Sequence, residues 1–459
     1  MIHKPRAPLV LLINPWITDF AAHDLWAKPL GLLYLASLLR EGGCGTTFID
    51  CLDRHDPFTN SHPGVLPGRD RKFGTGKYPR MRIPKPEPYA GFPRYFHRHG
   101  IHPESFRRKL SEIERPDMVW VTSVMTYWYP GVLDAIRMVR EVFPGVPVWL
   151  GGIYARLCPS HAARWSGADR VVTEDLARIP DMICALTGFC PSNGDVWGDF
   201  NAWPLPALDL LKPAPDYAPL LTGVGCPYRC PYCASARLQP KRAKLDAHRI
   251  MEQIAWGRDV LGVRDFAFYD DALLLDAEKT LRPVLETIAG QGPKIRFHVP
   301  NALHVRALSR QWCDLLYAAG FRTVRLGLET ALDGRSLEWG GKVDAEMYLE
   351  AVCNLFKAGF SQEDVGTYLL CGLPGQTVEE VAQSIRFVRQ SGAQPRVAEF
   401  SPIPGTLMWD KAVAVSTFDI GAEPLYHNNT FFACRRPDFS YGDMVALKKL
   451  QRAGESVNG

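Results

Sequence analysis

The sequence contains no stretch of about 18 uninterrupted apolar residues, so it predicts no membrane-spanning helix. Its first residues, MIHKPRAPLVLLINPW, hold only a short apolar run. Asn14-Pro15 follows where a signal peptide would carry small residues for cleavage. We therefore interpret this run as a first buried strand and expect a cytoplasmic protein, in which thiols stay reduced. With 46% hydrophobic and 22% charged residues among 459, the composition is that of a globular protein with a sizeable core.

A second cysteine pair with the spacing of a zinc site is also missing. A closed zinc site needs four ligands, usually supplied as two closely spaced pairs, and the 12 cysteines provide no second pair. Nine of them stand singly in apolar or loop contexts, where a free cysteine usually acts as a small buried hydrophobe. These nine are Cys44, Cys51, Cys158, Cys184, Cys190, Cys313, Cys353, Cys371 and Cys434.

The remaining three cysteines form one compact motif, GVGCPYRCPYCAS, with Cys226, Cys230 and Cys233 in a C-x3-C-x2-C pattern. Three thiolates this close in sequence can bind three irons of a 4Fe-4S cluster and leave the fourth iron open for chemistry. Zinc is the alternative, since C-x2-C is also half of a zinc site. The type and number of the ligands favour the iron–sulfur cluster.

Residues 1–190 are predicted to form a doubly wound, mostly parallel α/β sheet, because strand-like and helix-like segments alternate. The strand-like segments are 8–13, a short run ending at Asp50, 117–123, 147–152 and 168–174. In such sheets ligands bind beyond the carboxyl ends of the strands. Asn14, Asp50, Ser123, Gly151 and Gly152 are therefore expected to share one rim. The glycines could instead serve only as a tight turn.

A basic insert at 54–115 interrupts this alternation. It holds 14 Lys/Arg against 6 Asp/Glu, a balance of +8, whereas the whole chain is only +4. Its many prolines, glycines and histidines predict an extended excursion without regular elements. A basic segment interleaved with aromatic residues could bind nucleic acid or an anionic substrate, and a solvated loop is the simpler interpretation.

The C-terminal half is predicted to be a partial barrel. Residues 191–215, rich in proline, are interpreted as a linker, 216–406 as the barrel and 407–459 as a helical extension or substrate lid. Six strand-like segments, each followed by a helix or loop, indicate a (βα)6 arrangement, in which functional groups gather at the carboxyl ends of the strands. Those ends hold the cysteine loop and a further set of residues: Asp270-Asp271, His298 to Asn301, Glu329, GLPG at 372–375 and PGT at 404–406.

Each strand end also has a structural interpretation. The aspartate pair could start a turn, Glu329 could be a solvated strand end, and GLPG could be only a β-turn. Their recurrence at successive strand ends beside a three-cysteine loop favours a functional site.

The cysteine loop, with Tyr232 just before Cys233, resembles the signature of radical S-adenosylmethionine (radical SAM) enzymes, and FYDD, RLGLET, GLPGQT and SPIPGT resemble the strand ends of their barrel. The resemblance implies that a cluster on the three cysteines binds and reductively cleaves S-adenosylmethionine to generate a 5′-deoxyadenosyl radical. It also implies cofactor contacts for six residues. Glu329 would hold the ribose hydroxyls, Asp270 would lie near the cofactor's polar end, and the adenosine would be flanked by Tyr232, Gly372, Pro374 and Pro404.

The N-terminal segments PLGLLYLASLLREGG, PDMVWVTS and VPVWLGGIYARLCPSHA resemble the cobalamin-binding-type domain of B12-binding radical SAM proteins. The chain departs from the D-x-H-x-x-G loop of classical cobalamin modules. After the first strand it has Asp19 and His23, and the one D-x-H of these N-terminal segments, Asp53 to His55, follows the second strand. Many radical SAM relatives also lack the histidine. Ser123, Gly151 and Gly152 remain as candidates to hold the corrin tail.

Two functions follow from the resemblance. The first is a cobalamin-dependent radical SAM transferase that methylates an unactivated carbon. The alternative is a radical SAM enzyme of another reaction type whose N-terminal domain binds no cobalamin. A small-molecule, lipid or peptide substrate and an electron donor such as flavodoxin or ferredoxin are the expected partners. Nucleic acid is not favoured, because the chain lacks the second cysteine cluster and RNA-binding tail of methylthiotransferases.

Overall fold

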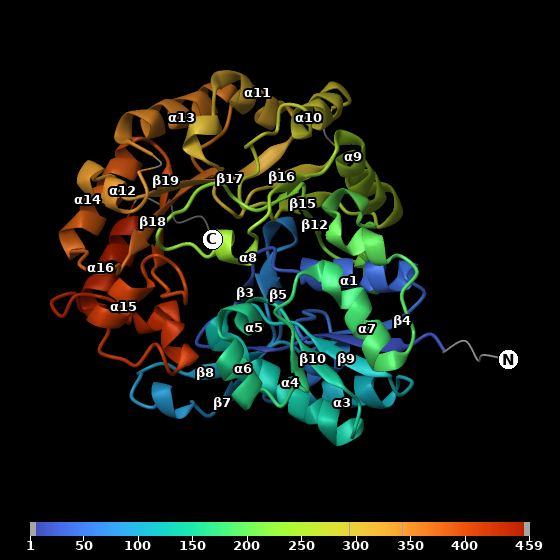
Figure 1. The fold of residues 1–459 in the computed structure, drawn as a ribbon. Helices are drawn as coiled ribbons and strands as arrows, with labels where there is room; N and C mark the ends of the chain where they lie inside the picture. The colour runs from blue at the N-terminus through green and yellow to red at the C-terminus, as the bar shows by residue number, and fades with distance from the viewer. Residues whose placement is uncertain (1–5, 293, 342, 454–459) are drawn as a thin grey trace. The chain divides into compact units, whose positions relative to one another are not determined.

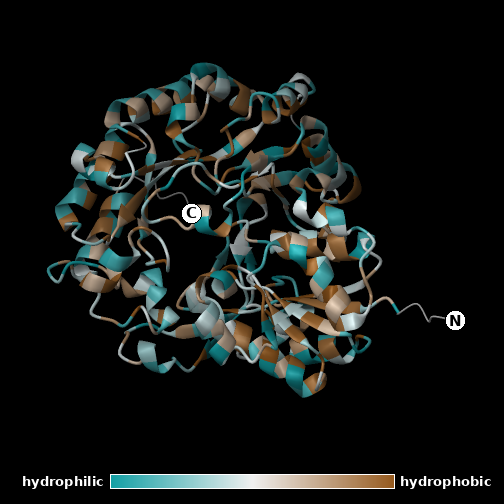
Figure 2. Ribbon diagram, in the orientation of Figure 1, coloured by the Kyte–Doolittle hydropathy of each residue, from teal (hydrophilic) through white to brown (hydrophobic). Residues whose placement is uncertain are grey.

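The computed structural model describes residues 6–292, 294–341 and 343–453 (Figure 1). The chain divides into two compact units, Met1–Tyr217 and Ala218–Gly459. None of the described helices is long and apolar enough to cross a membrane. Figure 2 shows hydrophobic and hydrophilic residues alternating along the helices, as expected of helices that bury one face.

A five-stranded parallel sheet in the order β11-β10-β9-β1-β4 is the centre of the first unit. By position along the chain this order is 2-1-3-4-5, a doubly wound arrangement, so the predicted fold class is confirmed. Its strands are β1 (Leu9–Asn14), β4 (Gly45–Asp50), β9 (Met118–Val121), β10 (Val148–Leu150) and β11 (Arg170–Val171). The connecting helices are α1 (Leu30–Glu41), α4 (Tyr129–Val142), α5 (Ile153–Leu157), α6 (Pro159–Trp165) and α7 (Ile179–Thr187).

The strand β1 shows why this sheet is covered on both faces. Successive side chains of a strand point to opposite faces. Val10 and Leu12 lie in one hydrophobic cluster together with residues of α1 and α7, whereas Leu11 and Ile13 lie in another cluster with residues of α4. A continuous apolar run is therefore required here, in agreement with the rule for parallel sheets.

The basic insert is more regular than its composition predicts. It contributes two helices, α2 (Pro57–Ser61) and α3 (Pro103–Ser111), and strands of two small antiparallel sheets, β2-β8-β7 and β3-β6-β5. The strands are β2 (Ile17–Asp19), β3 (His23–Asp24), β5 (Arg69–Asp70), β6 (Gly76–Lys77), β7 (Arg80–Ile83) and β8 (Phe96–His99). The expectation of an extended excursion was wrong because β2 and β3, which supply the pairing edges, lie outside the insert.

A buried arginine joins the insert to the rest of the first unit. The Arg54 guanidinium is almost completely buried and donates to Asp24, Asp70 and Asp216, at 3.1, 2.6 and 2.6 Å. Three carboxylates around one guanidinium compensate the cost of burying its charge. Residues 54 and 216 are thereby held together across most of the unit's sequence.

Residues 191–215, predicted as a linker, consist of short 3-10 turns, with Trp197 and Ala207 in the same hydrophobic cluster as α1. Just before them, Cys184 and Cys190 form a disulfide, with Cα atoms 4.4 Å apart. These two cysteines were expected to be free. Gly188 ends α7 in a left-handed conformation, and this reversal brings Cys190 back beside the last turn of the helix.

The second unit is a six-stranded parallel sheet in the order β12-β15-β16-β17-β18-β19, which confirms the predicted partial (βα)6 barrel. The strands are β12 (Ala218–Leu220), β15 (Asp265–Phe268), β16 (Arg296–His298), β17 (Phe321–Glu329), β18 (Val365–Cys371) and β19 (Gln394–Glu399). Helices separate them along the chain: α9 (Ala247–Ala255), α10 (Leu281–Gly290), α11 (Arg310–Ala318), α12 (Asp333–Glu338), α13 (Ala345–Ala358) and α14 (Val378–Gln390).

Residues after β19 belong to the second unit as well. They form α15 (Trp409–Val415), two 3-10 turns and α16 (Tyr441–Arg452). The Gln451 side chain of α16 accepts a hydrogen bond from the Val397 amide of β19 at 3.0 Å, and Lys448 forms an ion pair with Glu399. The extension therefore covers the last strand of the sheet.

Candidate functional site

The cysteine loop is held at its base by a short antiparallel ribbon that follows β12. Its strands are β13 (Gly223–Val224) and β14 (Ala243–Lys244), and residues 225–242 form the connection between them, including the short helix α8 (Ser235–Leu238). Gly225 has φ +76, and a Cβ there would lie 2.6 Å from the Lys241 carbonyl oxygen. A glycine is therefore required where the chain enters the loop.

None of the three loop cysteines forms a disulfide. Cys226 and Cys230 are half-buried and Cys233 is exposed. The Cys233 amide donates to the Cys230 carbonyl at 3.0 Å, and the Ser235 amide donates to the Cys233 Sγ at 3.4 Å. Burial raises the pKa of the Cys226 thiol, and the charges of Asp271, Cys230 and Cys233 raise it further. The three sulfurs therefore share one electrostatic environment, in which a bound cation would favour the thiolates.

The donor set fits an iron–sulfur cluster better than a single ion. Thiolates select zinc or iron–sulfur centres among the common biological metals. Ligands of one zinc ion lie about 2.3 Å from it, so their sulfurs must be close together. Among the described residues, the groups whose ligand atoms all lie within 4.8 Å of one another do not include these cysteines. A wider spacing is what a multi-iron cluster needs.

Tyr232 and Glu329 bring the loop and the end of β17 together. The Tyr232 hydroxyl is buried, and burial raises the pKa of this phenol, with the nearby Glu329 carboxylate and Cys230 thiol raising it further. Glu329 is the last residue of β17 and has φ +67, with a register shift between Gly327 and Glu329 against β18. A non-glycine residue in this region is strained, and such strain concentrates at functional sites.

The GLPG turn after β18 is braced from below by a buried side chain. The Gln376 side chain accepts hydrogen bonds from the amides of Gly372 and Leu373 at 2.7 and 3.3 Å. It also donates a hydrogen bond to the Leu370 carbonyl at 3.0 Å. Gly372 has φ +85, and a Cβ there would enter the ring of Phe432. Pro374 is buried beside it. The turn is thus rigid, so its backbone can present fixed polar groups.

The loop after β19 contacts the cysteine loop. The Met408 amide donates to the Pro231 carbonyl at 2.9 Å, and the Arg237 side chain lies against Gly405. Pro404, half-buried, lies one residue before that glycine. The structure therefore brings the cysteine loop close to two strand ends, those of β17 and β19.

Asp270 has a different environment from the one that the resemblance implies. Its carboxylate is buried and accepts hydrogen bonds from the Thr222 amide at 3.0 Å and the Thr222 hydroxyl at 2.7 Å. The Lys244 ammonium lies 3.7 Å from the same carboxylate. Thr222 precedes β13 and Lys244 ends β14. Asp270 therefore holds the base of the ribbon that carries the cysteine loop.

Asp271, the second residue of the aspartate pair predicted after β15, lies close enough to Cys226 to raise the pKa of that thiol. Two further residues near the loop were not selected from the sequence. Gly340, with φ +116, approaches the Cys230 Cα, which would be 3.6 Å from an added Cβ. The preceding Trp339 is buried in a hydrophobic cluster against which Tyr232 packs. The only sequence signal was the Gly340-Gly341 pair, and it gives no spatial partner.

The first unit places the predicted rim residues together. Asn14 and Asp50 are paired across β1 and β4, and the Asn14 amide donates to Asp50 at 2.7 Å. The Ser123 hydroxyl donates to the Gly151 carbonyl at 2.6 Å, and the Ile153 amide donates to the Ser123 carbonyl at 2.7 Å. In a 2-1-3-4-5 sheet the ligand crevice lies where the strand order reverses, between β1 and β9.

The two glycines of this rim differ in their surroundings. Gly152 has φ +92, and a Cβ there would lie 2.2 Å from the Ser123 carbonyl oxygen, so only glycine fits. Nothing lies within 4 Å of the position that a Cβ of Gly151 would take. The space beside Gly151 is a cradle of the kind that a cofactor tail needs.

Of the candidate residues for a D-x-H loop, Asp19 and His55 have other side-chain partners. The Asp19 carboxylate accepts hydrogen bonds from the Trp128 indole N–H at 2.7 Å and the Phe20 amide at 2.6 Å. His55 lies 2.8 Å from Asp216, and that carboxylate raises the pKa of the imidazole. The backbone of His23 belongs to β3 and lies opposite Lys77 of β6. The described residues thus offer no Asp–His pair arranged as in the D-x-H-x-x-G loop.

Comparison with known families identifies the barrel. Residues 220–388 match the model of the radical SAM superfamily, so the cluster and S-adenosylmethionine assigned from the cysteine loop are confirmed. Among curated proteins, an uncharacterized methyltransferase of Pyrococcus horikoshii is 26% identical over 330 residues, which cover 65% of this chain and 70% of that protein.

Solved structures share the fold of nearly the whole chain. The radical S-adenosylmethionine methyltransferase TsrM from Kitasatospora setae, solved with tryptophan substrate and a SAM analog, matches 97% of this chain and 89% of its own, with a TM-score of 0.68 and 15% identity. The cobalamin-dependent S-adenosylmethionine radical enzyme OxsB matches 99% of this chain and 62% of its own, with a TM-score of 0.59 and 13% identity. At these identities the likeness establishes the fold alone.

Proposed function

We propose that this chain, a radical SAM enzyme through its residues 220–388, uses cobalamin to methylate an unactivated carbon. The observation that carries the proposal is the loop of three cysteines, none of them in a disulfide, beside the Glu329–Tyr232 contact, in a chain whose other unit is a 2-1-3-4-5 sheet with open space at Gly151. The names of two similar proteins support it, since TsrM is a methyltransferase and OxsB is cobalamin-dependent.

In the barrel, Cys226, Cys230 and Cys233 would hold a 4Fe-4S cluster as thiolates. When bound, the cluster supplies the electron that cleaves S-adenosylmethionine. Glu329 would accept hydrogen bonds from the ribose hydroxyls, and its fixed backbone would aim the carboxylate. Tyr232 and the turns that contain Gly372, Pro374 and Pro404 would flank the adenosine and exclude water.

In the first unit, Ser123, Gly151 and Gly152 would hold the tail of cobalamin. The hydrogen bond from Ser123 to Gly151 fixes the turn, and the missing side chain of Gly151 leaves room for the tail. Because His55 is engaged by Asp216, we do not assign His55 as a cobalt ligand. We assign 1–190 to this domain, 191–215 to the linker, 216–406 to the barrel and 407–459 to a closing extension.

The reaction needs a reductant and a substrate. A flavodoxin or ferredoxin would supply the electrons, and we infer a cytoplasmic location from the need for such a donor. The substrate would be a small molecule, lipid or peptide with a carbon too unreactive for direct methylation.

The test is anaerobic purification of the full chain from cells supplied with cobalamin, followed by iron and sulfide analysis and mass spectrometry of the bound corrin. We expect about four irons and one corrin per chain. A chain with an intact cluster but no corrin would contradict the cobalamin assignment. A chain that retains zinc in place of iron would contradict the whole proposal.

A further inference from the structure

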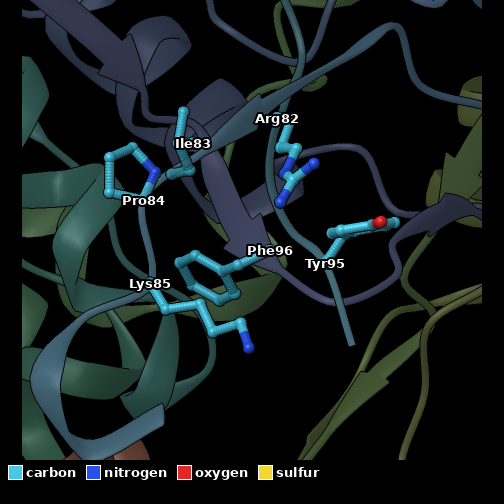
Figure 3. A pocket seen from close by; sticks show the side chains of 6 residues that line it. All are labelled: Arg82, Ile83, Pro84, Lys85, Tyr95 and Phe96. Atoms are coloured by element: carbon cyan, nitrogen blue, oxygen red, sulfur yellow. The ribbon is translucent and has the colours of Figure 1, made fainter. Parts of the chain in front are cut away.

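The basic insert carries a pocket that is separate from the candidate cofactor-binding residues. It has a volume of about 440 Å³ and lies on the β7–β8 ribbon of the first unit (Figure 3). Its six lining residues are Arg82, Ile83, Pro84, Lys85, Tyr95 and Phe96. The volume falls within the range typical of small-molecule sites.

The floor of the pocket is preformed. Ile83 and Phe96 are paired across β7 and β8, and Phe96 is almost completely buried. Its ring packs against Tyr89 and Phe20, each with a centroid separation of 5.4 Å. A ligand would therefore not have to order this surface on binding, which lowers the cost of association.

Two cations of the pocket have no acidic partner. Within the part of the chain that the structure describes, no carboxylate forms an ion pair with Arg82 or Lys85. The Arg82 guanidinium lies 3.8 Å from the centroid of the Tyr95 ring, and the Lys85 ammonium donates to the Phe92 carbonyl. Figure 3 shows the Arg82 guanidinium next to the Tyr95 ring, with the Phe96 ring and Lys85 across the pocket. The N–H edge of a stacked guanidinium is suited to a carboxylate or phosphate.

The surroundings are electropositive as well. His97, paired with Arg82 across the ribbon, has its pKa lowered by burial and by Arg80, Arg82 and Arg94. An anion would be attracted to such a surface before it contacts the pocket.

We propose that this pocket binds the carboxylate or phosphate of a small molecule with an apolar body. Arg82 and Lys85 would bind the anionic group, and Ile83, Pro84 and Phe96 would contact the body. The bounded volume favours a small molecule over a nucleic acid. One face of Tyr95 is already covered by Arg82, so that face is not available to a base.

The test uses equilibrium dialysis of the full chain against 1-naphthoate, 1-naphthyl phosphate and neutral 1-naphthol. The key variant is Arg82→Gln, and Arg69→Gln, an exposed arginine of the same insert outside the pocket, is the matched control. We expect both anions to bind at least tenfold more tightly than naphthol, and Arg82→Gln to weaken them about tenfold or more. Arg69→Gln should change their affinity less than twofold.

Each arm separates one explanation from the others. Equal affinity for naphthol and the anions would overturn the proposal. Equal losses of anion affinity in Arg82→Gln and Arg69→Gln would also overturn it, because they would indicate only a general attraction to the positive charge of the insert. If naphthoate alone or naphthyl phosphate alone depends on Arg82, the anion is a carboxylate or a phosphate, respectively. An oligothymidylate that binds more tightly than the naphthyl anions and depends on Arg82 would assign the pocket to nucleic acid and overturn the small-molecule proposal.

Discussion

Glu329 combines a chemical role with a conformational cost. Its φ of +67 lies in the left-handed region, which costs a residue with a Cβ about 1 kcal/mol or more. At this residue the pairing register with β18 shifts, so the carboxylate does not follow the alternation of side chains along the strand. It lies near Tyr232 instead. The chain therefore tolerates strain at the position where we assign the ribose contact.

Replacing Glu329 separates these two properties. Glu329→Ala and Glu329→Gly both remove the carboxylate, and only alanine keeps the strained Cβ. We expect both variants to bind S-adenosylmethionine at least tenfold more weakly, because a charge-assisted hydrogen bond is lost. The glycine variant should be more stable to denaturant than the alanine variant by about 1 kcal/mol. Wild-type affinity in either variant would contradict the ribose assignment.

The adjacent glycines at the rim of the first unit provide a second matched pair. Gly152→Ala forces a Cβ to within 2.2 Å of the Ser123 carbonyl oxygen, so we expect a loss of roughly 3 kcal/mol in unfolding free energy. Gly151→Ala meets no neighbour and should fold normally while it lowers the corrin content of the purified chain. Melting curves and corrin analysis of both variants check this. A Gly151→Ala protein with full corrin content would show that the tail lies elsewhere.

At the scale of elements, the β13–β14 ribbon depends on the buried carboxylate of Asp270. An Asp270→Asn amide can still accept from the Thr222 amide and can donate its N–H2 to the Thr222 hydroxyl, but it would leave Lys244 without its charge partner. We expect a loss of roughly 3 kcal/mol and a lower iron content. The control is Asp259→Asn, an exposed carboxylate paired with the adjacent Arg258, which should leave the unfolding curve unchanged. Full iron content in Asp270→Asn would contradict the anchoring role.

The strand β8 gives the first unit a pH dependence. Burial lowers the pKa of His99 from 6.5 to about 3. Between these values the unfolded chain binds a proton that the folded chain does not. Stability is therefore complete above pH 6.5 and falls by up to about 1.4 kcal/mol per unit as the pH decreases. In His99→Gln, whose amide can still donate to the Asp19 carbonyl, unfolding curves from pH 7 to 4 should show a smaller slope. An unchanged slope would contradict this origin.

The sequence predicted those features that depend on residues close together along the chain. The apolar run of β1 and the three-cysteine spacing each depend on nearby residues. The small sheets of the insert were missed because β2 and β3 have only two or three residues each and pair with strands far along the chain. The positive φ of Glu329 and the contact between Gly152 and Ser123 were missed for the same reason, since a non-local neighbour imposes each of them.

At the scale of the whole molecule, two units divide the chemistry. The barrel supplies the three cysteines and the strand ends near them. The sheet of the first unit supplies a rim of strand ends with open space beside Gly151. The sequence identified the barrel through its strand ends in order along the chain. The hydrogen bonds of Asp270 could not be foreseen from the sequence, because an acidic residue after a strand looks the same whether its carboxylate faces a ligand or the Thr222 amide.

The most direct test of the account is the release of 5′-deoxyadenosine by the reconstituted full chain with S-adenosylmethionine and a chemical reductant. Cys230→Ser removes one assigned cluster ligand, and Cys353→Ser, an exposed cysteine of α13, is the matched control. The account predicts release by the wild type and by Cys353→Ser and none above background by Cys230→Ser. Release by Cys230→Ser at the wild-type rate would contradict the assignment of the three-cysteine loop as the catalytic centre.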